Sequence, residues 1–446
     1  MNQGYSEADT LLHARWIIPV EPHGQVFERH SIAIQEGKIL DILPSIDAQR
    51  LYKVPKTCRY DSHVIIPGLI NAHTHAAMTL FRGLSDDLPL MQWLNEHIWP
   101  AEQRWVCEEF VQDGVRHAIA EMIRGGITCF NDMYFFPDET AGIASDVGMR
   151  AAVGLIVIDF PTRWANGADE YLYKGEKVHD RFRHDPLIHT ALAPHAPYTV
   201  SDEALKRVKA LADKLEVPVH MHVHETSGEV HDAVKNTGER PLKRLERLGF
   251  LSSRLQAVHM TQLDEDELAT LGRSRVHIMH CPESNLKLGN GFCPVQALHE
   301  AGVNVAIGTD GAASNNDLDM FSEMRTAALL AKAVSGDPSA IPAPSALRMA
   351  TLNGARALGI DSITGSLVAG KSADITVVDL SSVESQPLYD PVSQLVYATG
   401  RDKVSDVWVA GKQLLNNRQL LTIDADNVLE RSGLWRDKLA VFAHQN

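Results

Sequence analysis

Two histidines stand one residue apart at the end of an apolar run near residue 70. The stretch 67–75 reads PGLINAHTH, so His73 and His75 have a spacing of two. Side chains alternate along a strand, and residues with this spacing point the same way, so both imidazoles can reach one point. Such a pair commonly supplies two metal ligands, although two packing histidines held by hydrogen bonds are the alternative.

Further polar residues end other apolar runs. In HMHVHE the residues His220, His222 and His224 share a parity, and spacing alone does not choose among them. His259 closes the next run, and Asp310 follows a later one in GTDGAASNN. Several imidazoles with one carboxylate match the ligand preferences of Zn²⁺ and Fe²⁺, and burying so many polar groups together is costly unless a partner such as a metal compensates.

Residues 63–362 indicate the element that gathers these side chains. Short and nearly continuous apolar runs alternate there with helix-period segments such as CEEFVQDGVRHAIAEMIRGG. Strands buried on both faces and joined by helices predict a parallel sheet, and eight of them predict an α/β fold with a closed (β/α)8 TIM barrel. In such barrels the functional groups lie at the carboxyl ends of the strands, where the residues above fall.

The two ends of the chain carry a different pattern. Residues 1–62 and 363–446 contain short alternating runs, including SIAIQEGKILDIL and GSLVAGKSADITVVDL. This period of two predicts half-buried strands. We therefore expect the terminal segments to pair as a composite β-sandwich domain beside the barrel.

The predicted fourth barrel strand, LIHTALAPHAPYT, contains no lysine. Some two-metal barrels bridge their ions with a modified lysine at this position. One metal is therefore the better prediction. His277 and His280, on the seventh strand, are better explained as hydrogen-bonded residues of the barrel lining.

Composition excludes several classes of function. The 446 residues carry a net charge of −15, which argues against a nucleic-acid surface. No apolar run approaches the ~18 residues of a membrane helix, and the N-terminus lacks the pattern of a signal peptide. The five cysteines form no CxxC pair, so neither a disulfide framework nor a cysteine zinc site is indicated. We expect a cytoplasmic protein.

Five motifs together carry a resemblance to a known family. PGLINAHTH, HVHET, AVHM, SNLKLGNG and GTDGAASNN occur in the order found in the amidohydrolase superfamily. The chain most resembles the branch of 5'-methylthioadenosine and S-adenosylhomocysteine deaminases, over nearly its whole length.

The resemblance implies a role for each residue of the predicted metal site. It makes His73, His75, His222 and Asp310 the ligands of one divalent metal per subunit, with Zn²⁺ expected and Fe²⁺ as the alternative. Glu225 becomes the proton shuttle, since it would protonate ring N1 of an adenine while activated water attacks C6. His259 would orient that water, and Asp310 would accept its proton.

The long segment after the first barrel strand, TLFRGLSDDLPLMQWLNEHIWPAEQRW, is the predicted cover of the substrate. The resemblance implies that Trp93 lines the pocket and that Glu102 binds the ribose hydroxyls, which suits a bidentate carboxylate acceptor. It also makes His195 a contact to the base and Ser314 a further substrate contact. Without the family, loop packing for Trp93 and a helix-cap role for Glu102 are the simpler readings.

The substrate tail is where the sequence departs from the family. Related S-adenosylhomocysteine deaminases bring arginines from the region after the third strand to the amino-acid tail, and here Arg163 is the only nearby candidate. The expected reaction is therefore deamination of 5'-methylthioadenosine to the inosine analogue and ammonia, with S-adenosylhomocysteine and adenosine as further candidates.

Three alternatives remain open. A deaminase or dechlorinase of a free nucleobase, guanine, cytosine or a triazine would share the ligand set, and only Trp93 and Glu102 argue against it. A dihydropyrimidinase is disfavoured by the missing lysine. A non-catalytic barrel would be expected to lose ligands, and none is missing. The family also implies a homo-oligomer, either a dimer or a tetramer.

Overall fold

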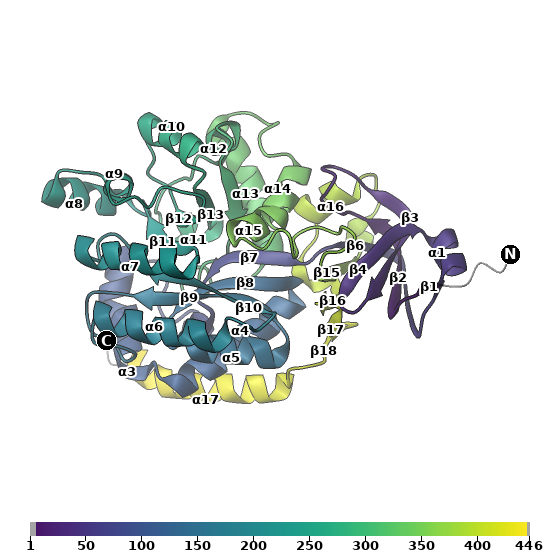
Figure 1. Cartoon of the computed structure of the whole chain (residues 1–446), viewed down its shortest axis with the longest axis horizontal. Helices are drawn as coiled ribbons and strands as arrows, with labels where there is room; N and C mark the ends of the chain where they lie inside the picture. Colours follow the sequence, from purple (N-terminus) through teal and green to yellow (C-terminus); the bar gives the residue numbers. More distant parts are fainter. Residues whose placement is uncertain (1–5, 444–446) are drawn as a thin grey trace.

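The computed structural model describes residues 6–443 and consists of a barrel with a second sheet at one end (Figure 1). The barrel sheet has the strand order β14-β13-β12-β11-β10-β9-β8-β7, and every neighbouring pair is parallel. Its strands are β7 (Leu69–Thr74), β8 (Ile127–Tyr134), β9 (Arg150–Val157), β10 (Ile188–Pro194), β11 (Val219–Val223), β12 (Leu255–His259), β13 (His277–His280) and β14 (Asn304–Ile307). The predicted parallel sheet of eight strands is confirmed.

The barrel closes just beyond the end of β14. There the Asp310 main-chain N–H donates to the His73 carbonyl at 3.0 Å, and the Asn71 side chain accepts from the Thr309 N–H at 3.0 Å. Two residues of the predicted metal site are thus joined through their backbones.

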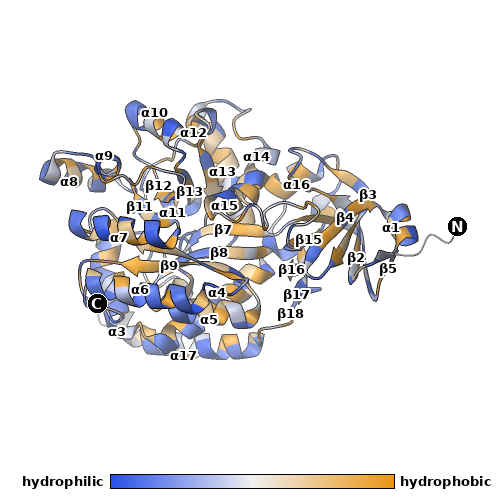
Figure 2. Ribbon diagram, in the orientation of Figure 1, coloured by the Kyte–Doolittle hydropathy of each residue, from blue (hydrophilic) through white to orange (hydrophobic). Residues whose placement is uncertain are grey.

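Helices surround the barrel, and their amphipathic pattern explains their placement. Figure 2 shows mostly apolar barrel strands, whereas the surrounding helices are banded with polar residues. The predicted helical stretches form α4 (Glu108–Arg124) and α7 (Asp202–Leu215), each with its apolar residues buried. The other barrel helices include α5 (Pro137–Val147), α6 (Ala168–Phe182), α8 (Ser227–Thr237), α9 (Pro241–Arg247), α10 (Glu265–Ser274), α11 (Pro282–Lys287), α12 (Val295–Glu300), α13 (Met320–Ser335), α14 (Ala343–Met349) and α15 (Leu352–Ala357).

The second sheet is built from both ends of the chain, as predicted. It is one continuous hydrogen-bonded sheet in the order β18-β17-β16-β15-β6-β2-β3-β4. The two ends meet where β15 pairs antiparallel with β6. The strands are β2 (Thr10–Ile17), β3 (Phe27–Gln35), β4 (Lys38–Pro44), β6 (Lys56–Pro67), β15 (Ile375–Asp379), β16 (Val404–Val409), β17 (Lys412–Asn416) and β18 (Gln419–Leu420).

The boundaries between the two parts differ from those predicted. The expected boundary at residue 62 falls inside β6, which belongs to the terminal sheet up to Pro67. The apolar run divides at Gly68, where an added Cβ would lie 2.0 Å from the Thr128 hydroxyl, so the chain passes too close to β8 for a side chain. The barrel therefore begins at Leu69.

The last helix is the other departure from the predicted terminal domain. Helix α17 (Ala425–Ala443) lies along the barrel helix α4 rather than on the second sheet (Figure 1). Trp435 Nε1 and Arg431 Nε donate to Asp113 of α4 at 2.8 and 2.9 Å. Within the described part of the chain, no helix has both the length and the apolar character needed to cross a bilayer.

Candidate active site and metal centre

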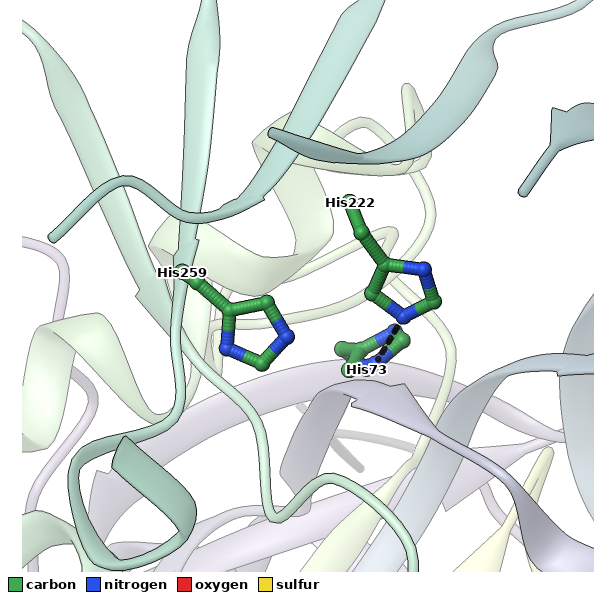
Figure 3. Close-up of side chains that lie close together, drawn as sticks. All are labelled: His73, His222 and His259. Carbon is green, nitrogen blue, oxygen red and sulfur yellow. Dashed lines mark hydrogen bonds between the residues drawn. The ribbon is translucent and has the colours of Figure 1, made fainter. Parts of the chain in front are cut away.

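Four side chains converge at the carboxyl ends of the barrel strands. The Nε2 atoms of His73 and His75 each lie 3.3 Å from Asp310 Oδ1. His222 Nε2 lies 3.3 Å from His73 Nε2, and Figure 3 shows their rings pointing toward each other beside that of His259. The four predicted ligands therefore meet at one place.

These residues are presented by the ends of three strands. His73 lies within β7, His75 follows that strand, and His222 lies within β11. Asp310 comes after β14 with a φ of +59°, a left-handed conformation that residues with a Cβ rarely adopt. Strained backbone of this kind persists where the surrounding structure requires it, and here it directs the carboxylate to the histidines.

Hydrogen bonds at the far side of the rings fix which nitrogen faces the cluster. His75 Nδ1 donates to the Met133 carbonyl at 2.5 Å, and His222 Nδ1 donates to the His195 carbonyl at 2.8 Å. In both rings Nε2 is therefore the nitrogen that faces the centre. Hydrogen bonds from the other ring nitrogen to carbonyl groups commonly orient the imidazoles that bind metals.

The three histidines of equal parity on the fifth strand have three different roles. Only His222 reaches the cluster. His220 is buried, and its Nε2 hydrogen-bonds His73 Nδ1 at 2.9 Å, so it supports a ligand. His224 lies past the end of β11, where its ring bonds the main chain of Gln262 and Leu242.

The two histidines of β13 also lie outside the cluster. His277 Nδ1 accepts a hydrogen bond from the Asn304 side chain at 3.0 Å, in line with its predicted role. His280 is buried, and neither ring nitrogen has a partner among residues 6–443. The predicted hydrogen bond of His280 stays a prediction.

The electrostatics of the cluster favour a cation. Burial lowers the pKa of His73 to about 4 and lowers the pKa of His222 as well, so both rings are neutral, which is the form that binds metals. Burial alone would also lower the pKa of His75, but its hydrogen bond with Asp310 raises it to about 9, so a bound metal would displace a proton from this ring. Burial alone would raise the pKa of Asp310, but hydrogen bonds from His73 and His75 hold it well below its usual range. Within the described residues, two groups of possible metal ligands share His73, one with His75 and Asp310 and the other with His222 and His259. Imidazoles with a carboxylate suit a divalent metal ion, and the exact ligand set stays a prediction.

Two further groups stand beside the cluster. Glu225 follows β11, and its Oε1 lies 3.7 Å from His259 Nε2. Burial raises the pKa of Glu225, while the nearby His259 opposes that effect. His259 ends β12 with a φ of +75°, so it too is held in a left-handed conformation. The pair lies where the sequence predicts the proton shuttle and its neighbour.

A cavity of about 290 Å³ opens directly onto these residues. One wall comes from residues 90–106, which overlap the predicted cover at 79–105 and include the π-helical turn η2 (Trp93–Ile98) and helix α3 (Trp99–Trp105). All four predicted substrate contacts line the cavity, namely Trp93, Glu102, His195 and Ser314. The structure thus brings them together with the metal-binding residues.

The two predicted contacts from the cover are held in place by hydrogen bonds. Trp93 Nε1 donates to the Ser85 carbonyl at 3.0 Å. Glu102 Oε1 accepts from the Tyr134 hydroxyl at 2.8 Å. Burial raises the pKa of Glu102 to about 7, although the bond from Tyr134 opposes this rise.

The other two contacts also touch neighbouring residues. His195 Nδ1 hydrogen-bonds Thr199 Oγ1 at 3.0 Å, and burial lowers the pKa of His195 to about 3, so its ring is neutral. The Ser314 hydroxyl donates to Asp310 Oδ2 at 2.9 Å. Ser314 therefore orients the carboxylate of the cluster in addition to lining the cavity.

Comparison with known proteins identifies the family. Residues 64–414 match the model of the amidohydrolase family. The chain belongs to the amidohydrolases. A curated relative from Saccharophagus degradans, called a 5-methylthioadenosine/S-adenosylhomocysteine deaminase, is 48% identical over 97% of both chains. A relative of the same name from Teredinibacter turnerae is also 48% identical, over 97% of this chain and 98% of its own.

Solved structures agree with this placement. An adenosine deaminase from Xanthomonas campestris with bound zinc has a TM-score of 0.97 and 52% identity, covering 98% of this chain and all of that one. An atrazine chlorohydrolase from Arthrobacter aurescens, at 23% identity and a TM-score of 0.88, covers 96% of this chain and 99% of its own and shares the fold. The predicted family and fold class are confirmed.

Several groups of this amidohydrolase site have no predicted role. Ser284 donates to Asp310 Oδ2 at 2.6 Å, and Tyr134 holds Glu102. Asn285 and Asn290 bond His259 and Glu225. Arg163, by contrast, is the only nearby candidate that the sequence offers for the substrate tail; it lines the cavity, and its exposed guanidinium makes no ion pair within the described residues. The first three sets could be found only through contacts between loops, which residue spacing does not encode.

Proposed function

We propose that this amidohydrolase is a hydrolytic deaminase of the adenine ring, with 5'-methylthioadenosine as its principal substrate. The observation that carries the proposal is a single cavity that joins a metal-binding cluster, a buried carboxyl group and a half-buried carboxyl group suited to bind ribose. Glu225 stands at one part of this cavity and Glu102 at another. The names of the relatives support the same activity.

The metal centre would supply the chemistry of the first step. A bound divalent ion, for which zinc is expected over iron, supplies the Lewis acidity that makes water nucleophilic near neutral pH. His73, His75, His222 and Asp310 would hold it. The zinc-bound relative from Xanthomonas campestris supports this choice.

Asp310, His259 and Glu225 have different roles in the proton transfers of the proposed reaction. Asp310, whose pKa is held low, accepts the proton of the attacking water, and His259 Nε2 orients that water. Glu225 is the acid, because burial raises its pKa and so favours the protonated form that can give a proton to ring N1. The resulting Glu225 carboxylate would take the proton of the new C6 hydroxyl group and pass it to the amine, so that ammonia leaves and the C6 carbonyl forms. The proton held by Asp310 would then restore the acid form of Glu225.

Substrate choice depends on groups farther along the cavity. An ionised Glu102 accepts hydrogen bonds from two ribose hydroxyls, which a free base lacks. The unpaired guanidinium of Arg163 is a suitable partner for the carboxylate of an amino-acid tail, which makes S-adenosylhomocysteine a second substrate. Adenosine, with neither tail, should be a poorer one.

A substrate panel tests this proposal. Metal-loaded protein is offered 5'-methylthioadenosine, S-adenosylhomocysteine, adenosine, adenine, guanine and cytosine, and ammonia release is measured with the loss of adenine absorbance. We expect preference for the two thio-nucleosides, and Arg163→Gln should lower kcat/KM for S-adenosylhomocysteine but not for 5'-methylthioadenosine. Activity on free bases alone would reject the ribose-binding role of Glu102 and favour the nucleobase deaminases.

The assembly and the location of the protein stay predictions. The family implies a homodimer or homotetramer, and the composition suits the cytoplasm. Light scattering on the purified protein measures the first, and fractionation of the source cells measures the second. A monomer in solution would contradict the expected oligomer.

A further inference from the structure

The segment after β13 contains a motif to which the proposed function gives no role. Residues 284–291 read SNLKLGNG and comprise most of α11 and the turn that follows it. Three side chains of this segment donate to or accept from three groups of the proposed proton pathway: Ser284 to Asp310, Asn285 to His259 and Asn290 to Glu225. One short segment thus contacts every group that handles a proton.

Asn290 holds the carboxyl group of the proposed acid. Its Nδ2 donates to Glu225 Oε1 at 3.1 Å, and Asn290 is only 5% exposed. The main chain of Asn290 is itself anchored, because its carbonyl accepts from Gln262 Nε2 at 2.7 Å and from Thr261 Oγ1 at 3.1 Å. Thr261 Oγ1 also donates to the Glu225 carbonyl at 2.8 Å, so both ends of the contact are tied to one strand end.

Asn285 holds the ring of the neighbouring histidine. Asn285 Oδ1 accepts from His259 Nδ1 at 2.9 Å, and Asn285 is 1% exposed. A proton fixed on Nδ1 leaves the lone pair on Nε2, the nitrogen that faces Glu225. This bond therefore holds the ring of His259, whose backbone has a φ of +75°.

We propose that Asn285 and Asn290 are positioning residues for the deamination, which set the tautomer of His259 and the orientation of the Glu225 carboxyl group. The inference rests on the proposed function. It assigns no contact with substrate to either asparagine. Their effect should therefore fall on the chemical step and leave the binding of the nucleoside unchanged.

Variants of Asn290 separate hydrogen bonding from packing. Asn290→Ala removes the donor, while Asn290→Asp keeps the size but presents a carboxyl oxygen to Glu225. We expect kcat for 5'-methylthioadenosine to fall about tenfold or more in both, since one hydrogen bond to a buried carboxyl group is lost, with KM and metal content unchanged. Asn285→Ala should behave similarly through His259.

A binding measurement that needs no turnover accompanies the kinetics. A purine analogue with a hydroxyl group on a tetrahedral C6 should raise Tm of the wild type strongly and Tm of the variants less, whereas the inosine product should raise all equally. The control is Asn353→Ala, whose amide donates to the Val305 carbonyl at 2.9 Å, away from the cavity. It should lower Tm and leave kcat intact.

Two results would overturn the proposal. One is a wild-type kcat in Asn290→Asp, and the other is a loss of activity explained entirely by lost metal or raised KM. If the wild type itself deaminates no nucleoside, the proposed function fails instead, and the parallel wild-type assay tells the two failures apart.

Discussion

At the residue scale, the pKa values of two buried carboxyl groups of the site, Asp310 and Glu225, are shifted in opposite directions. Hydrogen bonds from two histidines keep Asp310 ionised, whereas burial favours the protonated form of Glu225. Environments that drive two acids apart in this way allow one to act as base and the other as acid at the same pH. The proposed division of proton transfers follows from this difference.

Replacement of the acid tests that division. In Glu225→Gln the side chain keeps its shape and loses its proton, so kcat should fall by ~10²–10⁴ while metal content stays at the wild-type level. Glu203→Gln, on the exposed side of α7, serves as the control and should be fully active. Near-normal turnover of Glu225→Gln would exclude the carboxyl group as the proton shuttle.

The pH dependence should report the ribose acceptor. Because burial raises the pKa of Glu102 to about 7, the acceptor form is depleted below that pH and complete above it. The ratio of kcat/KM between wild type and Glu102→Gln should therefore rise as pH increases through 7. Tyr134→Phe removes a hydrogen bond that favours the ionised form, so the rise should move to higher pH. A flat ratio across pH 6–8 would contradict the assignment.

At the element scale, an ion pair joins the cover of the cavity to α11. Asp86 precedes the cavity-lining residues of the cover, and its Oδ1 accepts from Lys287 Nζ of α11 at 2.6 Å. Asn316, beyond β14, donates to the same carboxylate at 3.2 Å. The cover is therefore joined to the loops that carry the proton-handling groups.

Removal of this ion pair should weaken substrate binding. In Asp86→Asn we expect KM for 5'-methylthioadenosine to rise up to about fivefold with metal content unchanged, because a partly exposed ion pair contributes at most about 1 kcal/mol. High salt should reduce the difference from wild type. Asp87→Asn is the matched control, since its exposed neighbouring carboxylate has a φ of +61° that asparagine tolerates. An equal effect in both variants would reject the role of the ion pair.

Elements differ in how well the sequence predicts them. Alternation along a strand correctly placed His73 and His75, but it left His220, His222 and His224 equivalent. The choice depends on where β11 ends and which ring nitrogen is already bonded, and both are tertiary facts. Asn285 lies in the short helix α11 and Asn290 in the turn after it, so only the folded loops reveal their partners.

At the scale of the whole molecule, a buried ion pair joins the barrel to the terminal sheet. Arg150 Nε of β9 donates to Asp374 Oδ2 at 2.9 Å, with both side chains almost fully buried. Asp374 also accepts from the Ala410 N–H at 2.7 Å, and its carbonyl accepts from the Gly68 N–H at 2.9 Å. The carboxylate thus connects the sheet to the start of the barrel.

Breaking this pair should destabilise the whole chain. Arg150→Met leaves a buried carboxylate without its partner, which costs about 3–5 kcal/mol and should lower Tm by several degrees. Arg183→Met removes a surface ion pair with Asp180 and should change Tm little. Equal Tm values for the two variants, measured by calorimetry, would contradict the account.

The sequence predicts the overall architecture better than its boundaries. The barrel and the pairing of the two chain ends follow from hydrophobic period, which reports burial on one or both faces. The end of β6 depends on a close approach between Gly68 and Thr128, and the place of α17 depends on its contacts with Asp113. Neither contact leaves a periodic signal.

The most direct test of the central claim is the mass of the product formed in water enriched in oxygen-18. Zinc-loaded protein is incubated with 5'-methylthioadenosine, and product and ammonia are measured together. Hydrolytic deamination predicts one labelled oxygen in an intact 5'-methylthioinosine, one ammonia for each product molecule, and no conversion after the metal is removed with a chelator. Release of free adenine, or unlabelled product, would show that water does not attack C6 and would contradict the account.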